Sequence, residues 1–83
     1  MTLLYFAWVR QKVGAAQETI DLPPDVKTVR ELVEHLRTRG GGFLDAFADP
    51  ARLRAAVNQE HTGFDAAISD TDEVAFFPPV TGG

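Results

Sequence analysis

The chain has 83 residues, 45% of them hydrophobic and 24% charged, with a net charge of −4 and no cysteine. This length fits one small domain, and the lack of cysteine excludes disulfides, thiolate metal sites and a cysteine nucleophile. The charges are mixed along the chain without a basic run, so nucleic-acid binding is not expected. The longest apolar run, Leu3 to Val9, is too short to span a bilayer and follows no basic segment, so we expect a cytoplasmic protein without a membrane partner.

The first quarter of the chain predicts two strands. Leu3 to Arg10 is rich in aromatic and aliphatic residues, which is typical of a strand. Gln11 to Ala16 is expected to be a connection, with Gly14 as its breaker. Gln17 to Leu22 can form a second strand, which Pro23-Pro24 ends because proline donates no ladder hydrogen bond.

The next segment predicts the main helix. Thr28 and Glu31 fit a capping box, in which each side chain satisfies a free backbone donor of the other residue. Apolar residues then recur at the spacing of one helix face, at Val29, Leu32, Val33 and Leu36. Gly40-Gly41-Gly42 is expected to end this helix.

The remaining segments predict short elements around a sheet. Phe43 to Phe47 suggests a short helical turn that covers the core. The elements expected after it are a turn at Asp49-Pro50, a strand over Leu53–Asn58, a turn with a short strand within Asn58–Asp65, a turn over Asp70–Asp72 and a strand over Glu73–Phe77. This order predicts an α+β fold with one main helix on one face of a mixed sheet. Residues 1–77 would form the domain, and 78–83 a flexible tail.

Alternation in the first and last strands predicts an apolar outer face. Thr2 and Arg10 are polar and even-numbered, so the even residues between them should face away from the helix. In the last strand Glu73 is odd, which turns the other odd positions outward as well. A patch this apolar usually marks a partner site. The predicted interface residues are Leu4, Phe6, Trp8 and Phe77, with Ala75 beside them. The patch would not exist if the alternation of faces were displaced by one residue, or if a loop covered these side chains.

Other motifs favour structural roles. His35 follows Glu31 by four residues and suggests a surface ion pair, and His61 lies in an expected turn without a second ligand at metal spacing. Gly40-Gly41-Gly42 lacks the lysine and hydroxyl residue of a phosphate loop. The acidic residues near Asp70 are explained as turn residues rather than an acid–base pair. We therefore predict no metal site and no catalytic set.

The sequence ends in Thr81-Gly82-Gly83 after Pro78-Pro79-Val80. Glycine has no Cβ, so its backbone can pass through a narrow channel, and the Gly83 carboxylate is unhindered. A carboxylate is a poor electrophile until it is activated, for example as an acyl-adenylate. No residue pattern in this chain indicates that it could carry out that activation itself. A frayed end is the ordinary alternative. We expect instead that the terminal carboxylate is a substrate presented to other proteins.

The run Asp72 to Gly83 resembles the C-terminus of the molybdopterin synthase small-subunit family, whose members are ubiquitin-like sulfur carriers. The likeness continues in Ala55 to Gln59 and in Phe6-Ala7 with Val9-Arg10. It covers most of the chain and is weak from Gly40 to Leu53. It implies the β-grasp arrangement of ubiquitin. The family often has Asp-Gly-Asp where this chain has Asp70-Thr71-Asp72, and Thr71 would be strained if that turn needs a positive φ.

The resemblance also implies a function. A ubiquitin-activating-type adenylyltransferase would adenylate Gly83, and a sulfur donor protein would convert it to a thiocarboxylate. Thr81 and Gly82 would thread into the large synthase subunit, where sulfur passes to cyclic pyranopterin monophosphate and forms the molybdopterin dithiolene. The chain would bind no cofactor and would not be an enzyme on its own, because the catalytic residues are expected on the large subunit.

Three other functions fit parts of the sequence. A thiamine-pathway sulfur carrier shares the fold and the Gly-Gly end, although Phe77-Pro78-Pro79-Val80 argues against it. A ubiquitin-like modifier joined to lysines by isopeptide bonds uses the same activation chemistry. A plain β-grasp interaction module would make the terminal glycines an accident.

Overall fold

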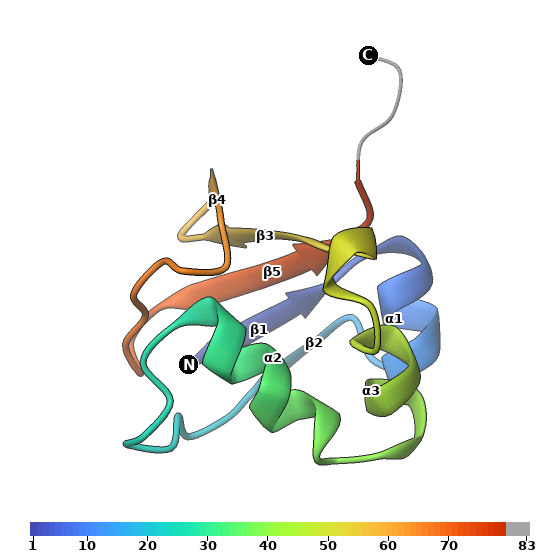
Figure 1. The fold of residues 1–83 in the computed structure, drawn as a ribbon, viewed down its shortest axis with the longest axis horizontal. Helices are drawn as coiled ribbons and strands as arrows, with labels where there is room; N and C mark the ends of the chain where they lie inside the picture. The colour runs from blue at the N-terminus through green and yellow to red at the C-terminus, as the bar shows by residue number, and fades with distance from the viewer. Residues whose placement is uncertain (80–83) are drawn as a thin grey trace.

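The first and last strands, β1 (Thr2–Tyr5) and β5 (Glu73–Phe77), lie side by side and parallel in the middle of the sheet. The structure is a computed structural model that describes residues 1–79. Its five-stranded sheet has the order β2-β1-β5-β3-β4, with antiparallel pairing outside the central pair (Figure 1). The other strands are β2 (Gln17–Thr19), β3 (Arg54–Val57) and β4 (Glu60–Thr62). The predicted mixed sheet is confirmed.

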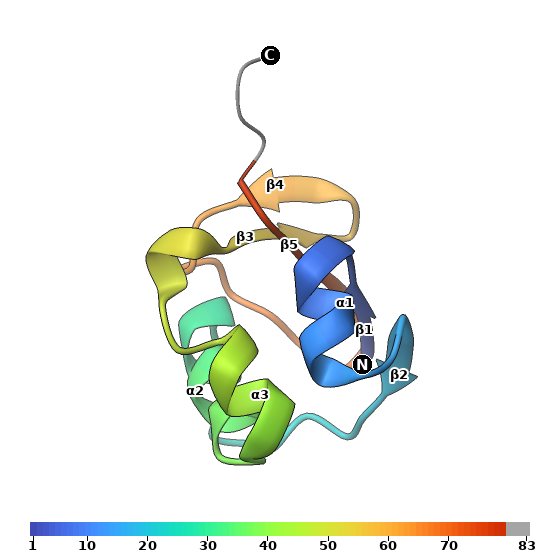
Figure 2. The ribbon, with the colours of Figure 1, turned by 90° about the vertical axis from the view of Figure 1, so that its right-hand side faces the viewer.

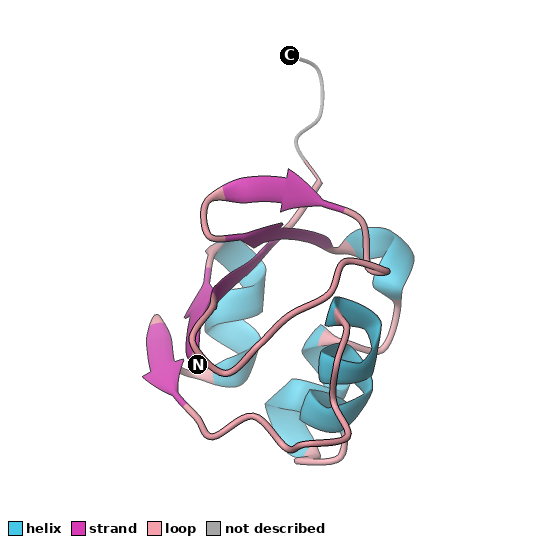
Figure 3. Cartoon of the chain, turned by 90° about the vertical axis from the view of Figure 1, so that its left-hand side faces the viewer, coloured by secondary structure: helices cyan, strands magenta, loops and turns pink. Residues whose placement is uncertain are grey.

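The helices lie on one side of this sheet (Figures 2 and 3). They are α1 (Ala7–Val13), α2 (Val29–Arg37), α3 (Gly41–Ala46) and the 3-10 turn η1 (Pro50–Arg52). Within residues 1–79, α2 is the longest of them, as the prediction of one main helix requires. The α+β class is therefore confirmed, with a second helix, α1, that the sequence pattern did not predict.

The predicted first strand is wrong beyond Tyr5. The ladder continues as far as the Phe6 amide, which donates to the Phe76 carbonyl at 3.1 Å. Ala7 then takes a positive φ of 53°, and the chain turns into α1. An apolar run this short fits a buried helix as well as a strand. Gly14 is the breaker that was expected, since it ends α1 in the left-handed region with φ 84°.

Helix α2 forms as its sequence predicts. The Thr28 hydroxyl accepts a hydrogen bond from the Glu31 amide at 3.2 Å. The Glu31 carboxylate accepts from the Lys27 amide at 2.9 Å, one residue before the donor that a capping box normally uses. The four apolar residues of the predicted face are all buried: Val29, Leu32, Val33 and Leu36. This face supplies the helical half of the core.

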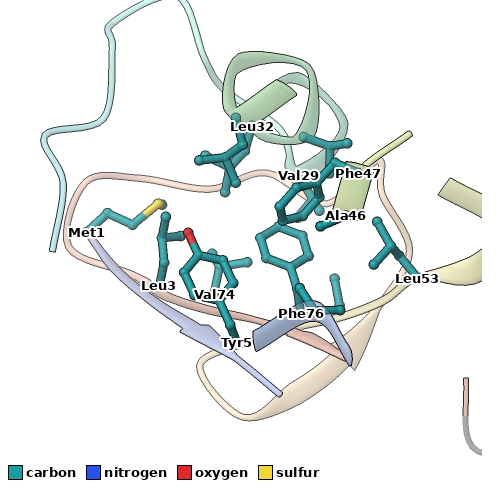
Figure 4. Packing of buried hydrophobic residues seen from close by; sticks show 14 of the residues in the cluster. Met1, Leu3, Tyr5, Val29, Leu32, Ala46, Phe47, Leu53, Val74 and Phe76 are labelled. Carbon is teal, nitrogen blue, oxygen red and sulfur yellow. The ribbon is translucent and has the colours of Figure 1, made fainter. Parts of the chain in front are cut away.

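The core fills the space between the helices and the inner face of the sheet (Figure 4). Leu3 and Tyr5 of β1 are buried, as are Val74 and Phe76 of β5, while the residues between them are more exposed. The Phe76 ring meets the Phe47 ring edge-on, with centroids 4.9 Å apart. The inward parity predicted for both strands is therefore confirmed.

Buried Tyr5 also connects four elements through its hydroxyl group. That hydroxyl donates to the Glu18 carboxylate of β2 at 2.7 Å, and burial together with this carboxylate raises the pKa of Tyr5 well above its usual range. Arg39, just after α2, donates to the same carboxylate at 2.6 Å. Its guanidinium lies 4.0 Å from the centre of the Phe43 ring in α3. The network therefore ties the segment after α2 and the start of α3 to β1 and β2.

Two turns position β5. The hairpin between β3 and β4 has only Asn58 and Gln59 in its turn, with φ of 51° and 72°. The Asn58 side-chain oxygen accepts from the Glu73 amide at 3.0 Å, which fastens this hairpin to the start of β5. The turn before β5 closes where the Asp72 amide donates to the Ser69 carbonyl at 3.0 Å.

That second turn needs no glycine. Among residues 1–79, the residues other than glycine with positive φ are Ala7, Asn58 and Gln59. Thr71 is not one of them, so the threonine of this chain fits the turn without backbone strain. The second strand ends at Thr19 rather than Leu22, the third is one residue shorter at each end than expected, and the last strand has its predicted bounds.

Two further features concern the organisation of the chain: membrane-spanning helices and the boundary between the domain and its tail. No helix within residues 1–79 is long and apolar enough to cross a membrane. The predicted boundary between a body at 1–77 and a tail at 78–83 stays a prediction, because residues 80–83 lie outside the described part.

Gly42 provides a test of the helix packing. The glycine run does follow the end of α2, but Gly41 and Gly42 begin α3. A Cβ on Gly42 would clash with the Lys12 backbone carbonyl near the end of α1. We predict that Gly42→Ala lowers the free energy of unfolding by about 1–3 kcal/mol, as overpacking does. Chemical denaturation of the two proteins measures this difference.

Gly63→Ala is the matched control, since a Cβ there meets open space. It should leave stability within about 0.5 kcal/mol of the original chain, the usual range for surface changes. Equal effects of the two substitutions would show that α1 and α3 do not approach at Gly42 as described.

Candidate docking face beside the tail

One row of side chains crosses the outer face of the sheet from edge to edge. Leu4 of β1 pairs with Gln17 of β2 on one side and with Ala75 of β5 on the other. Ala75 pairs with Ala56 of β3, and Ala56 pairs with His61 of β4. Directly paired residues point to the same face of a sheet. The face opposite the helices therefore has an apolar centre.

Phe77 and Phe6 extend this centre toward the end of the two parallel strands. Phe77 is half-buried in the next row, and its ring centroid lies 5.0 Å from that of His61. Phe6 follows β1 and is 49% exposed, which is high for a large apolar side chain. We call Leu4, Phe6, Ala56, Ala75 and Phe77 the outer patch.

The structure separates the residues that were predicted to form one interface. Leu4 and Phe77 lie on the outer face as expected, and Phe6 is exposed beside them. Trp8 is not on this face, which corrects the prediction for it. Because the chain turns at Ala7, Trp8 belongs to α1, where it packs partly against the core and faces the Arg52 guanidinium 5.2 Å from its ring.

The outer patch borders the point where the chain leaves the sheet after β5. Since β1 and β5 are parallel, their carboxyl ends lie side by side at one end of the sheet, next to α1 (Figure 2). Pro78 follows Phe77 directly at that end. Thr81, Gly82 and Gly83 lie outside the described residues, so their predicted roles as threading and carrier residues stay predictions.

The acidic residues near the last turn hold backbone in place. The Asp70 carboxylate accepts from the Leu22 amide at 2.8 Å, and this bond lowers the pKa of Asp70. The Asp72 carboxylate accepts from the Asn58 side chain at 2.9 Å and from the Ser69 amide at 2.8 Å, and these bonds lower the pKa of Asp72. A lowered pKa keeps both groups ionised at neutral pH, which suits anchoring rather than proton transfer.

The histidines also differ from expectation. Within residues 1–79, no ion pair joins His35 to Glu31, whose carboxylate bonds the Lys27 amide at the start of α2 instead. In the same part of the chain, no group of three or more histidine, cysteine, aspartate or glutamate side chains could hold a metal ion. His61 was expected in a turn, but it lies in β4 on the outer face. Its orientation depends on the two-residue turn at Asn58-Gln59, a weak signal in the sequence.

Two curated proteins are similar to this chain over nearly their whole length. The molybdopterin synthase sulfur carrier subunit of Escherichia coli is 43% identical over 81 residues, which cover 98% of this chain and 96% of that protein. The corresponding subunit of Haemophilus influenzae is 36% identical over 83 residues, covering 100% and 99%. The resemblance inferred from the terminal run is thereby confirmed.

Solved structures show the same fold. A Pyrococcus furiosus structure assigned to molybdopterin converting factor subunit 1 superposes with a TM-score of 0.74 at 32% identity, covering 95% of each chain. SAMP1 of Haloferax volcanii gives a TM-score of 0.72 at 25% identity, covering 100% of this chain and 98% of that one. The ThiS family model matches residues 3–83. The chain therefore belongs to the ThiS family, which confirms the ubiquitin-like fold expected from the sequence.

Proposed function

We propose that this chain is the sulfur-carrier subunit of a molybdopterin synthase and that the Gly83 carboxylate bears the sulfur. One observation carries the proposal: the chain matches molybdopterin synthase sulfur carrier subunits over nearly the full length of both. The family match also extends through the two terminal glycines. A carrier without cysteine has no thiol of its own, so its terminal carboxylate is the group that sulfur can occupy.

The chemistry belongs to partner proteins. A ubiquitin-activating-type adenylyltransferase joins the Gly83 carboxylate to the AMP part of ATP and releases pyrophosphate. A sulfur donor protein then displaces AMP, which leaves a thiocarboxylate on Gly83. In the large subunit of molybdopterin synthase, two such thiocarboxylates each pass one sulfur to cyclic pyranopterin monophosphate, which builds the two-sulfur dithiolene and leaves each Gly83 as a carboxylate again. The acids and bases for these steps are supplied by the partners.

The role of this chain is then to dock and to deliver its last residue. Val80 to Gly83 is four residues, which reach at most roughly 14 Å when extended. The tail can enter a buried site only if the body docks close to the mouth of that site. The outer patch adjoins Phe77, directly before the tail, and its apolar character suits a protein contact. We assign the outer patch to the large subunit, with Thr81 and Gly82 in the channel.

A second function, protein modification, is favoured by one observation. SAMP1, the small archaeal modifier protein 1 of Haloferax volcanii, shares the fold at 25% identity over the whole chain, and a modifier uses the same adenylated glycine. In that case Gly83 would be joined to a lysine of another protein rather than to sulfur. A thiamine-pathway carrier would share the sulfur chemistry and differ in the acceptor.

Phe76 and Phe77 test the docking assignment. Phe77→Ala should weaken binding to the large subunit by about 2 kcal/mol or more, as loss of an interface hot spot does. Its fold should survive, because the side chain is half-buried on the outer face. Phe76 is fully buried, so Phe76→Ala should instead lower the free energy of unfolding by about 3–5 kcal/mol.

Calorimetric titration and thermal melts of the two variants separate these effects. The assignment of the two faces would be reversed if Phe77→Ala unfolded the protein and Phe76→Ala left it folded but unable to bind the large subunit.

The position of the carboxylate is tested by adding one alanine after Gly83. The reactive atom must be the last carboxylate of the chain, so the extended protein should fold normally and support no molybdopterin synthesis. Activity is measured in a reconstituted synthase, and intact mass confirms that the alanine is retained. Normal synthesis by an untrimmed extended protein would exclude the carrier mechanism.

The channel is tested by Gly82→Val. A β-branched side chain widens the tail and restricts its backbone, so activation or transfer of sulfur should fall sharply. The thermal midpoint should stay unchanged, because the core lies within residues 1–79. Gly63→Val, at an open position of the body, is the control. Wild-type transfer by Gly82→Val would mean that no narrow channel surrounds this residue.

A further inference from the structure

We infer that a cleft between the start of α2, η1 and the β3–β4 hairpin binds a small organic carboxylate with an apolar body. None of the outer-patch residues lines this cleft. The site goes beyond the proposed function and does not depend on it, because it involves neither the terminal glycines nor the proposed docking.

The cleft has a volume of about 320 Å³ and a largely apolar lining. Pro50 and Ala51 of η1 form part of it, together with Leu53 before β3 and Phe64 after β4. Leu53 is buried, and Phe64 packs partly against the core. Small-molecule sites are mostly apolar, begin at about this volume and carry a few polar groups that fix the orientation of the ligand. The cleft therefore suits the apolar body of a small ligand.

The polar side chains of the cleft are cations and one hydroxyl group. Arg30 of α2, Arg54 of β3 and Thr62 of β4 line it, and no aspartate or glutamate within residues 1–79 does so. This local excess of positive charge lies in a chain whose net charge is −4. Arg30 is paired with the Asp65 carboxylate at 3.0 Å, which leaves the charge of Arg54 uncompensated. One uncompensated guanidinium complements one carboxylate.

Arg54 is already held in place for such a partner. Its Nη1 atom donates to the Ala51 and Leu53 carbonyls at 3.2 and 2.8 Å, which fixes the guanidinium beside the apolar lining. Within residues 1–79, no carboxylate lies within ion-pair distance of Arg54, and its Nε and Nη2 atoms make no hydrogen bond. These nitrogens remain free to donate charge-assisted hydrogen bonds to a ligand carboxylate.

Hydrogen bonds of the fold also fix the walls of the cleft. The Arg30 amide donates to the Phe64 carbonyl at 2.8 Å, which fastens the segment after β4 to the start of α2. The Asp49 carboxylate accepts from the Ala51 amide at 3.1 Å and caps η1. The site is therefore formed before a ligand arrives, which lowers the cost of ordering on binding.

A second cleft, along α2, does not have this character. Its volume is about 450 Å³, and its lining includes the carboxylates of Asp25, Glu31 and Glu34. Arg30 is the one arginine in that lining. Three carboxylates near one guanidinium would repel an anion. The carboxylate site is therefore assigned to the cleft beside β3.

The test is titration of the full chain with 2-naphthoate at neutral pH and low ionic strength, followed through the NMR shifts of the backbone amides. We expect saturable shifts centred on Ala51, Leu53, Thr62 and Phe64. The dissociation constant should be about 1 mM or lower, as a ligand of this size allows. The neutral amide 2-naphthamide has the same apolar body and should bind about fivefold more weakly or less tightly still.

Two cleft variants and one control locate the site. Arg54→Gln should weaken naphthoate binding about fivefold, the upper range for an exposed ion pair. Arg30→Gln should weaken it less, because Asp65 already holds that guanidinium, and it serves as the test if Arg54→Gln does not fold. Arg37→Gln removes the same charge near the other end of α2, outside the cleft, and should leave the affinity unchanged.

The inference would be overturned if naphthoate caused no saturable shifts, or if the shifts centred on the outer patch. It would also be overturned if naphthoate and naphthamide bound equally well, or if both cleft variants kept the affinity of the original chain. None of these outcomes bears on sulfur at Gly83, so failure of this inference and failure of the proposed function are distinguishable.

Discussion

The parallel pairing of β1 with β5 is the constraint on which the rest of the structure depends. It joins the two ends of the described chain in the centre of the sheet, so everything between them must fold on one side or at the edges. Such a pairing of distant segments requires a crossover and carries the entropy cost of closing a long loop. The buried faces of α2 and both central strands offset that cost. Because the strands are parallel, their ends coincide, and Phe6 and Phe77 both lie at the end of the sheet where Pro78 follows.

In β5, the adjacent residues Phe76 and Phe77 face opposite sides of the sheet. Phe76 is fully buried against Phe47, whereas Phe77 faces outward beside His61. Stability therefore depends on one side of β5, which leaves the other side for the docking that we propose. Small residues, Ala56 and Ala75, occupy the centre of the outer face between larger side chains. Ala56 is buried there, and Leu4, Ala75 and Phe77 around it are partly exposed.

Much of this fold could be predicted where local signals agree with the tertiary structure. The capping residues of α2 and its four apolar positions predicted a helix that forms as expected, and Glu73–Phe77 was predicted at its observed bounds. Helix α1 could not be predicted because its start carries no capping signal. Phe6 makes no side-chain cap bond, and Ala7 adopts a positive φ that an alanine seldom takes. Trp8 was misplaced for the same reason.

The candidate site was predicted unevenly. Alternation identified Leu4 and Phe77 as outward-facing, since a period of two is unambiguous once polar residues such as Thr2 and Glu73 mark the outer face. His61 could not be placed this way, because its face depends on the number of residues in the turn at Asn58-Gln59. That turn is fastened where the Asn58 side chain accepts a hydrogen bond from the Glu73 amide and donates one to the Asp72 carboxylate, and neither bond is visible as a spacing pattern. The function proposed for Gly83 rests on the terminal motif and the family, not on the geometry of the sheet.

The central claim is that Gly83 carries sulfur, and intact-mass measurement of the protein purified from its native cells tests it most directly. The account predicts a population whose mass corresponds to the replacement of one oxygen by sulfur, with fragmentation placing the change on Gly83. A population joined through Gly83 to lysines of other proteins, with no thiocarboxylate form, would contradict it and identify a modifier.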